Sequence, residues 1–319
     1  MRLNLRLDPR PVEYDPSVQA DDRLTPPSVD LEVETREWSP RRVGPVQRPE
    51  LVAFVDGAQH IEARVLADDG ERLVYGAFVV FAVGAAICEP GRVTTRLIPP
   101  RRALTLSDGA REDDVDIECG AIRLRYVASP CGESGADAPA RELHRLRQDA
   151  ERDLGYELTE AGVPLVIADG PLRFQRRPKG HVLGIVKTMH TLYVDVAKLA
   201  CLAALRPGER SPVFLIERDR PVYSWFVRLG IGGPSDHALS GIVRVETMAD
   251  GVSLEETVAL ADRTAGLLPD FAGPAYWDAR APQNLVPIAG LERQLRRTLG
   301  DPAFVRRAIE AYLTREASG

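Results

Sequence analysis

The sequence contains no apolar run that approaches the roughly 18 residues needed to cross a bilayer. Residues 1–6 also lack the apolar core of a secretory signal, so we expect a soluble, cytoplasmic protein without membrane association. The four cysteines show none of the close pairing that is typical of zinc ligands, and free thiols are expected. These cysteines are Cys88, Cys119, Cys131 and Cys201.

Several signature motifs are missing as well. The chain has no G-x-x-x-x-G-K-[ST] phosphate loop and no G-x-S-x-G elbow, which argues against nucleotide hydrolysis and serine catalysis by this chain. Its net charge of −6 argues against a protein that coats nucleic acid by bulk electrostatics, because such binding needs many Lys and Arg side chains. Local basic patches remain, notably residues 173–179 and the arginines near the C-terminus.

Two Asp-Gly pairs stand at the ends of apolar runs. Residues 51–55 are followed by Asp56 and Gly57, and residues 165–168 are followed by Asp169 and Gly170. Each run is typical of a buried strand, so the two carboxylates are expected at a sheet edge, where they would hold a divalent cation. The alternative is ordinary turn chemistry, in which Asp-Gly simply closes a strand.

The order of apolar patterns predicts an α/β fold. Strand-like runs dominate residues 51–127, a Gly/Pro-rich linker follows at 130–139, and Leu143, Leu146, Ala150 and Leu154 predict an amphipathic helix over 140–160. Strands and helices then alternate to the C-terminus. We predict an extended N-terminal arm at 1–49, a main domain at 50–300 and a C-terminal helix at 301–319. Further strands are predicted at 61–66, 76–87, 94–97, 122–127, 182–186, 212–216, 222–229 and 241–245, and helices at 194–205, 253–268, 291–299 and 303–313.

Three motifs, taken in their order along the chain, resemble those of the NurA nuclease family. They are Phe54-Val55-Asp56-Gly57, then Ile167-Ala168-Asp169-Gly170-Pro171-Leu172, then Gly184-Ile185-Val186-Lys187, and the likeness spans roughly residues 50–300. The resemblance implies a ribonuclease-H-like mixed sheet flanked by helices and Mn²⁺- or Mg²⁺-dependent cleavage of DNA. It also implies a homodimer that works with a HerA-like hexameric ATPase in DNA end processing, repair or defence.

The resemblance implies that Asp56 and Asp169 hold the metal, together with a glutamate on the helix before Asp169. Glu142 and Glu151 are the candidates. The rise of about 1.5 Å per residue in a helix and about 3.3 Å in a strand places Asp169 level with residue 147, between the two glutamates. Both stay open, and a solvent-exposed role is the alternative for either.

The family also has a histidine near its C-terminus, preceded by a tyrosine. This chain has no histidine after His237 and offers Tyr276 and Asn284 instead. An asparagine carbonyl can bind a hard cation, although more weakly than imidazole binds manganese. The absence of this histidine is therefore expected to affect metal affinity and activity.

Other residues are candidates for DNA contact. Lys187 follows a buried strand and would meet a phosphate as a point charge, while Arg176 and Arg177 lie just after Asp169. The alternatives are a strand-end lysine that reaches solvent and a solvated basic loop. At the level of the whole protein, the competing hypotheses are a catalytically weak or silent adaptor that caps the ATPase ring, and a hydrolase of small phosphorylated metabolites.

Overall fold

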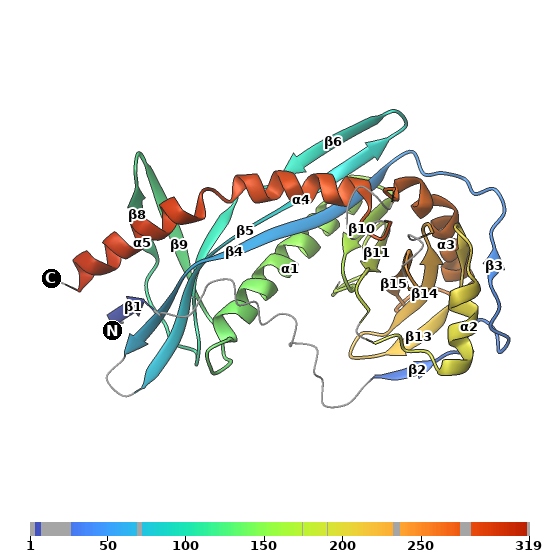
Figure 1. Cartoon of the computed structure of the whole chain (residues 1–319), viewed down its shortest axis with the longest axis horizontal. Helices are drawn as coiled ribbons and strands as arrows, with labels where there is room; N and C mark the ends of the chain where they lie inside the picture. The colour runs from blue at the N-terminus through green and yellow to red at the C-terminus, as the bar shows by residue number, and fades with distance from the viewer. Residues whose placement is uncertain are drawn as a thin grey trace.

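The computed structural model describes residues 4–7, 27–68, 72–173, 175–189, 191–231, 237–274 and 282–317. These residues form a 15-stranded mixed sheet with helices packed on both faces (Figure 1), which confirms the predicted α/β class. None of the helices in these ranges is both long and apolar enough to span a bilayer.

Two long antiparallel strands form the centre of the sheet. β4 spans Val52–Asp68 and β5 spans Leu73–Glu89, and both run through the middle of the molecule (Figure 1). The predicted strand end at Asp56 is therefore wrong: Asp56 and Gly57 stay in the ladder, opposite Gly84 and Val83. The physical reason is that β5 offers an equally long partner, so the ladder continues through a dipeptide that elsewhere closes strands.

The other strands extend the sheet on either side of this pair. On one side lie β6 (Arg92–Leu97), β7 (Arg101–Leu106), β9 (Ile122–Pro130) and β8 (Val115–Cys119). On the other side, in order from β4, lie β10 (Leu165–Asp169), β11 (His181–Val186), β15 (Ile242–Met248), β14 (Val222–Arg228), β13 (Phe214–Glu217) and β2 (Ser28–Asp30). Short strands β1 (Asn4–Leu7), β3 (Arg41–Arg42) and β12 (Glu209–Arg210) pair with β4, β12 and β14 respectively. β10 is parallel to both β4 and β11.

Helices cover the two faces of the central strands. α1 (Ala138–Glu160) packs the predicted stripe of Leu143, Ala150 and Leu154 into the core on one face. α4 (Val286–Thr298) packs Ile288, Leu291 and Leu295 into a second core on the other face. The remaining helices are α2 (Val196–Ala204), α3 (Leu254–Leu267), the 3-10 helix η2 (Leu268–Phe271) and α5 (Pro302–Glu316).

Candidate functional site

The strand register brings the two aspartates together. β10 pairs with β4 in parallel from Leu165 opposite Val52 to Ala168 opposite Val55, so one further step places Asp169 beside Asp56. Neighbouring strands lie about 4.8 Å apart, and residues in register on parallel strands point to the same face. Because β10 ends here while β4 continues, the two carboxylates lie where the sheet opens between these strands.

Lys187 and Asn284 complete one side of this site. Lys187 follows β11, and its Nζ donates to Asp169 Oδ2 at 2.7 Å and to Asn284 Oδ1 at 3.0 Å. Asn284 is buried just before α4. The sequence-predicted residues Asp169, Lys187 and Asn284, which come from three separate parts of the chain, therefore form one hydrogen-bonded chain of side chains.

Asp56 is the most strongly perturbed group of the site. Its side chain is buried, and Oδ1 accepts a hydrogen bond of 2.7 Å from the Gly57 amide. Burial, reinforced by the negative charges of Asp169 and Glu151, raises the pKa of Asp56 to about 8, while Gly57 and Lys187 act in the opposite direction. Desolvation and the two neighbouring carboxylates therefore both disfavour the ionised form of Asp56.

Glu151 approaches from the α1 side of the sheet. A Cβ at Gly57 would lie 2.5 Å from Glu151 Oε1, so the missing side chain opens the space that the glutamate occupies. Because side chains alternate along a strand, Asp56 and position 57 face opposite ways, and Glu151 meets β4 from behind Asp56. Burial raises the pKa of Glu151 to about 7, against the influence of the Arg147 guanidinium.

Glu142 lies away from the aspartates. It accepts hydrogen bonds from Ser129 Oγ at 2.8 Å and from Arg145 Nη2 at 2.6 Å, and it is buried near the N-terminal end of α1. Its Cα is two and a half helical turns from Glu151, roughly 14 Å along the axis. Of the two helix glutamates that the sequence left open, Glu151 is the one whose charge acts on Asp56 and Asp169, and it does so from the opposite face of β4.

Arg147 and Gln59 were missed in the sequence. Arg147 forms an ion pair with Glu151, and its Nε donates to Gln59 Oε1 at 2.8 Å. The estimate that residue 147 lies level with Asp169 pointed to this position, because Arg147 Cγ would be 2.9 Å from a Cβ at Gly57.

The predicted DNA-contacting arginines lie on the exposed loop that follows Asp169. The Arg176 guanidinium lies 4.2 Å from the centre of the Tyr156 ring, and Arg177 Nη1 donates to the Gly251 carbonyl at 2.5 Å. Tyr276 lies outside the described residues.

The donor chemistry of the site fits a hard divalent cation. Asp56, Asp169, Glu151 and Asn284 offer oxygen atoms, which Mg²⁺ and Mn²⁺ prefer, and a bound cation would favour the ionised form of Asp56. Within the described ranges, however, no three His, Cys, Asp or Glu side chains are close enough to form a ready metal cage. Lys187 holds Asp169 and Arg147 holds Glu151, so a cation would have to displace these two partners.

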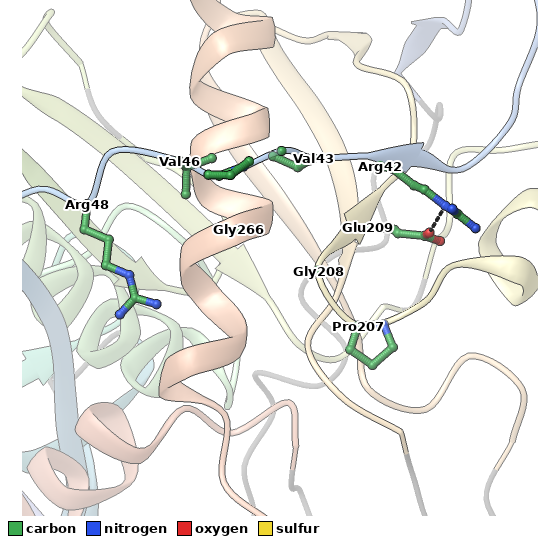
Figure 2. Close-up of a pocket in the computed structure, with 10 residues that line it drawn as sticks. Arg42, Val43, Val46, Arg48, Pro207, Gly208, Glu209 and Gly266 are labelled. Carbon is green, nitrogen blue, oxygen red and sulfur yellow. Dashed lines mark hydrogen bonds and ion pairs between the residues drawn. The ribbon is translucent and has the colours of Figure 1, made fainter.

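A separate pocket of about 590 Å³ lies on another part of the molecule. It is lined by residues 42–46, Arg48, Pro207–Glu209 and Gly266, with Arg42 bound to Glu209 and Val46 packed against α3 at Gly266 (Figure 2). None of the sequence-predicted site residues lines this pocket.

Comparison with known proteins gives no sequence match: no family model and no curated protein matches the chain. Among solved structures, the chain is similar to the crystal structure of the NurA nuclease from Sulfolobus solfataricus, with a TM-score of 0.47 and 13% sequence identity over 88% of each chain. Similarity at this level does not establish membership of the family.

Proposed function

We propose that this chain is a divalent-metal-dependent nuclease that cleaves DNA phosphodiester bonds, with Mn²⁺ or Mg²⁺ as cofactor. The observation that carries the proposal is the register of β10 on β4, which places Asp169 next to the buried, charge-crowded Asp56. Two adjacent carboxylates at the opening of a sheet, with a lysine and an amide oxygen beside them, form a site suited to a metal ion and a phosphate.

Each residue has a proposed role. Asp56 and Asp169 hold the cation, with the Asn284 amide oxygen as a further ligand. Glu151 would join them from the other face, through the opening between β4 and the end of β10. The bound ion would lower the pKa of a water and offset charge on the scissile phosphate. Lys187 would then exchange its contact with Asp169 for a phosphate oxygen, since a lysine ammonium is a mobile point charge. Arg176, Arg177 and Tyr276 are proposed DNA contacts.

The biological setting rests on the motif resemblance alone. On that basis we propose a homodimer that acts with a HerA-like hexameric ATPase in DNA end processing or defence. Because the chain lacks a phosphate loop, the energy for DNA translocation would come from the partner.

Asp56→Asn tests the proposal directly. The variant keeps the size of the side chain and removes its charge, so it should remain folded and lose cleavage of single-stranded DNA in Mn²⁺. Asp116→Asn, an exposed aspartate on β8, is the matched control and should cleave like the wild type. Undiminished cleavage by folded Asp56→Asn would show that the site assignment is wrong.

A second candidate function is a catalytically silent adaptor that caps an ATPase ring. The specific observation in its favour is that Asp169 and Glu151 are each neutralised by a cationic side chain of the chain itself. Titration with Mn²⁺ in a calorimeter separates the two candidates, because an adaptor without a metal site should release no binding heat. Nuclease assays with and without the ATPase then show whether the partner is needed for activity.

A further inference from the structure

A buried cluster of charges lies behind the candidate site. We call Arg218, Glu246 and Arg244 the ion triad. Glu246 on β15 is fully buried; its Oε1 accepts from Arg244 Nη2 and its Oε2 accepts from Arg218 Nη2, both at 2.9 Å. Burying such a cluster costs desolvation energy that apolar packing would avoid. The role of the triad is therefore to fix the geometry of the segments it binds, and not to increase the stability of the fold.

The ion triad holds the loop that leaves Asp169. The Leu172 amide donates to Glu246 Oε2 at 3.1 Å, and Arg218 Nη2 donates to the Leu172 carbonyl at 3.0 Å. The loop lies directly on β11, because a Cβ at Gly184 would be 2.6 Å from the Leu172 nitrogen and 2.7 Å from the Gly170 oxygen. Both polar groups of the Leu172 backbone are therefore bound by the triad.

The same cluster holds the segment that leaves Lys187. Arg244 Nη1 donates to the Thr191 carbonyl at 3.0 Å, and its guanidinium lies 4.8 Å from the centre of the Tyr193 ring. Tyr193 has a φ of 62°, a left-handed conformation that is uncommon for a bulky residue and persists only where the surroundings impose it. Arg244 supplies two of the contacts that hold this segment.

The triad acts on the site through the backbone. Glu246 is opposite Gly184 in the ladder, and Gly184 is opposite Ala168, so these residues share one face of the sheet. Asp169 is the next residue after Ala168, and its side chain therefore points to the other face. The triad can therefore set the position of the Asp169 carboxylate through the backbone, without any contact between a triad side chain and that carboxylate.

We propose that the ion triad is a positioning device, which fixes the backbone after β10 and after β11. It thereby holds Asp169 beside Asp56 for the cation, and holds Lys187 at the same opening for the substrate phosphate. This inference rests on the proposed metal-dependent function. Glu246 is the central member, because it binds Leu172 directly and joins the two arginines that hold the two segments.

The test compares Glu246→Gln with Glu62→Gln in the full chain. Glu62 is a matched control because it is also buried and is bound by Arg102 at 3.1 Å and by the Tyr126 hydroxyl at 2.6 Å. It lies about 20 Å along β4 from Asp56. Glu246→Gln should weaken Mn²⁺ binding about tenfold in calorimetry, as is typical when a group that orients metal ligands is lost. Amide hydrogen exchange should also quicken at Gly170, Leu172 and Arg173 and at residues 191–195. Glu62→Gln should change neither property.

Arg218→Gln provides a second variant if Glu246→Gln does not fold. Arg218 is partly exposed, so its loss should be tolerated, and it should loosen residues 170–173 while leaving 191–195 unchanged. If a folded variant binds Mn²⁺ like the wild type and exchanges at the wild-type rate, the positioning role is wrong and the metal site stands. If the wild type itself binds no Mn²⁺, the proposed function is wrong and the positioning role falls with it.

Discussion

Lys187 donates from Nζ to Asp169 Oδ2 at 2.7 Å, which joins the end of β11 to the end of β10 at the opening of the sheet. The ammonium occupies a carboxylate oxygen that a divalent cation would use. Under the proposed metal-dependent function, lysine and metal would compete for Asp169. The competition would give the site two states: a metal-free state closed by the ion pair, and a loaded state in which Lys187 is released toward the substrate.

Lys187→Met should strengthen Mn²⁺ binding and weaken DNA binding. Removing a like charge next to the cation should raise metal affinity by at least about fivefold, which corresponds to about 1 kcal/mol of repulsion. Calorimetry measures the metal affinity and fluorescence anisotropy measures DNA binding. Lys198→Met removes a lysine from a similar ion pair with Asp195, elsewhere in the fold, and should change neither. Unaltered metal affinity in Lys187→Met would contradict the competition.

Glu151→Gln and Glu142→Gln should differ in their effect on the metal. Glu151 lies against Gly57 and its charge acts on Asp56, whereas both oxygens of Glu142 are bound by Arg145. We expect Glu151→Gln to lower Mn²⁺ affinity and cleavage, and Glu142→Gln to retain both at the cost of some thermal stability. A reversed result would assign the third ligand to the other end of α1.

Gly57→Ala should disturb the site more than the fold. The added methyl group would meet the Glu151 carboxylate and the Arg147 stem, which are parts of flexible side chains that can move aside. We expect a small change in melting temperature and weaker Mn²⁺ binding, because Glu151 is displaced. Gly44→Ala adds the same group in open space and is the control. Wild-type metal affinity in Gly57→Ala would show that the position of Glu151 is unimportant.

The stability gain of Asp56→Asn should depend on pH. The ordinary pKa of an aspartate is 3.8 and the folded value here is raised to about 8, so between these values the unfolded chain releases a proton that the folded chain retains. The stability contributed by Asp56 is complete below about pH 4 and declines as the pH rises toward 8. In EDTA, the melting temperature of Asp56→Asn should therefore exceed that of the wild type increasingly from about pH 5 to about pH 8.

Mn²⁺ should reduce this difference, because a ligand that binds the folded wild type raises its melting temperature. A difference that stays constant across this pH range in EDTA would mean that Asp56 ionises normally in the folded protein. Thermal melts followed by circular dichroism, in matched buffers, measure both effects.

Local patterns predicted most of the secondary structure. The leucine and alanine stripe located α1, and the apolar runs located β5, β10, β11 and β14, because burial imposes helical or extended periodicity directly on the sequence. Local patterns did not predict that the strand continues through Asp56. An Asp-Gly pair can close a strand or continue it, and only the long partner β5 decided in favour of continuation.

The sequence by itself determined the α/β class and the two candidate aspartates, since these follow from residue type and short-range periodicity, while the helix glutamates came from the resemblance. The tertiary structure alone decided that Asp169 lies beside Asp56, that Glu151 rather than Glu142 packs against Gly57, and that Lys187 bridges Asp169 and Asn284. It also placed Arg147 beside Glu151, and the ion triad against the segments that follow β10 and β11. These relationships depend on strand register and on how far a helix is displaced along a sheet. Both are set by packing between distant segments, which no local pattern records.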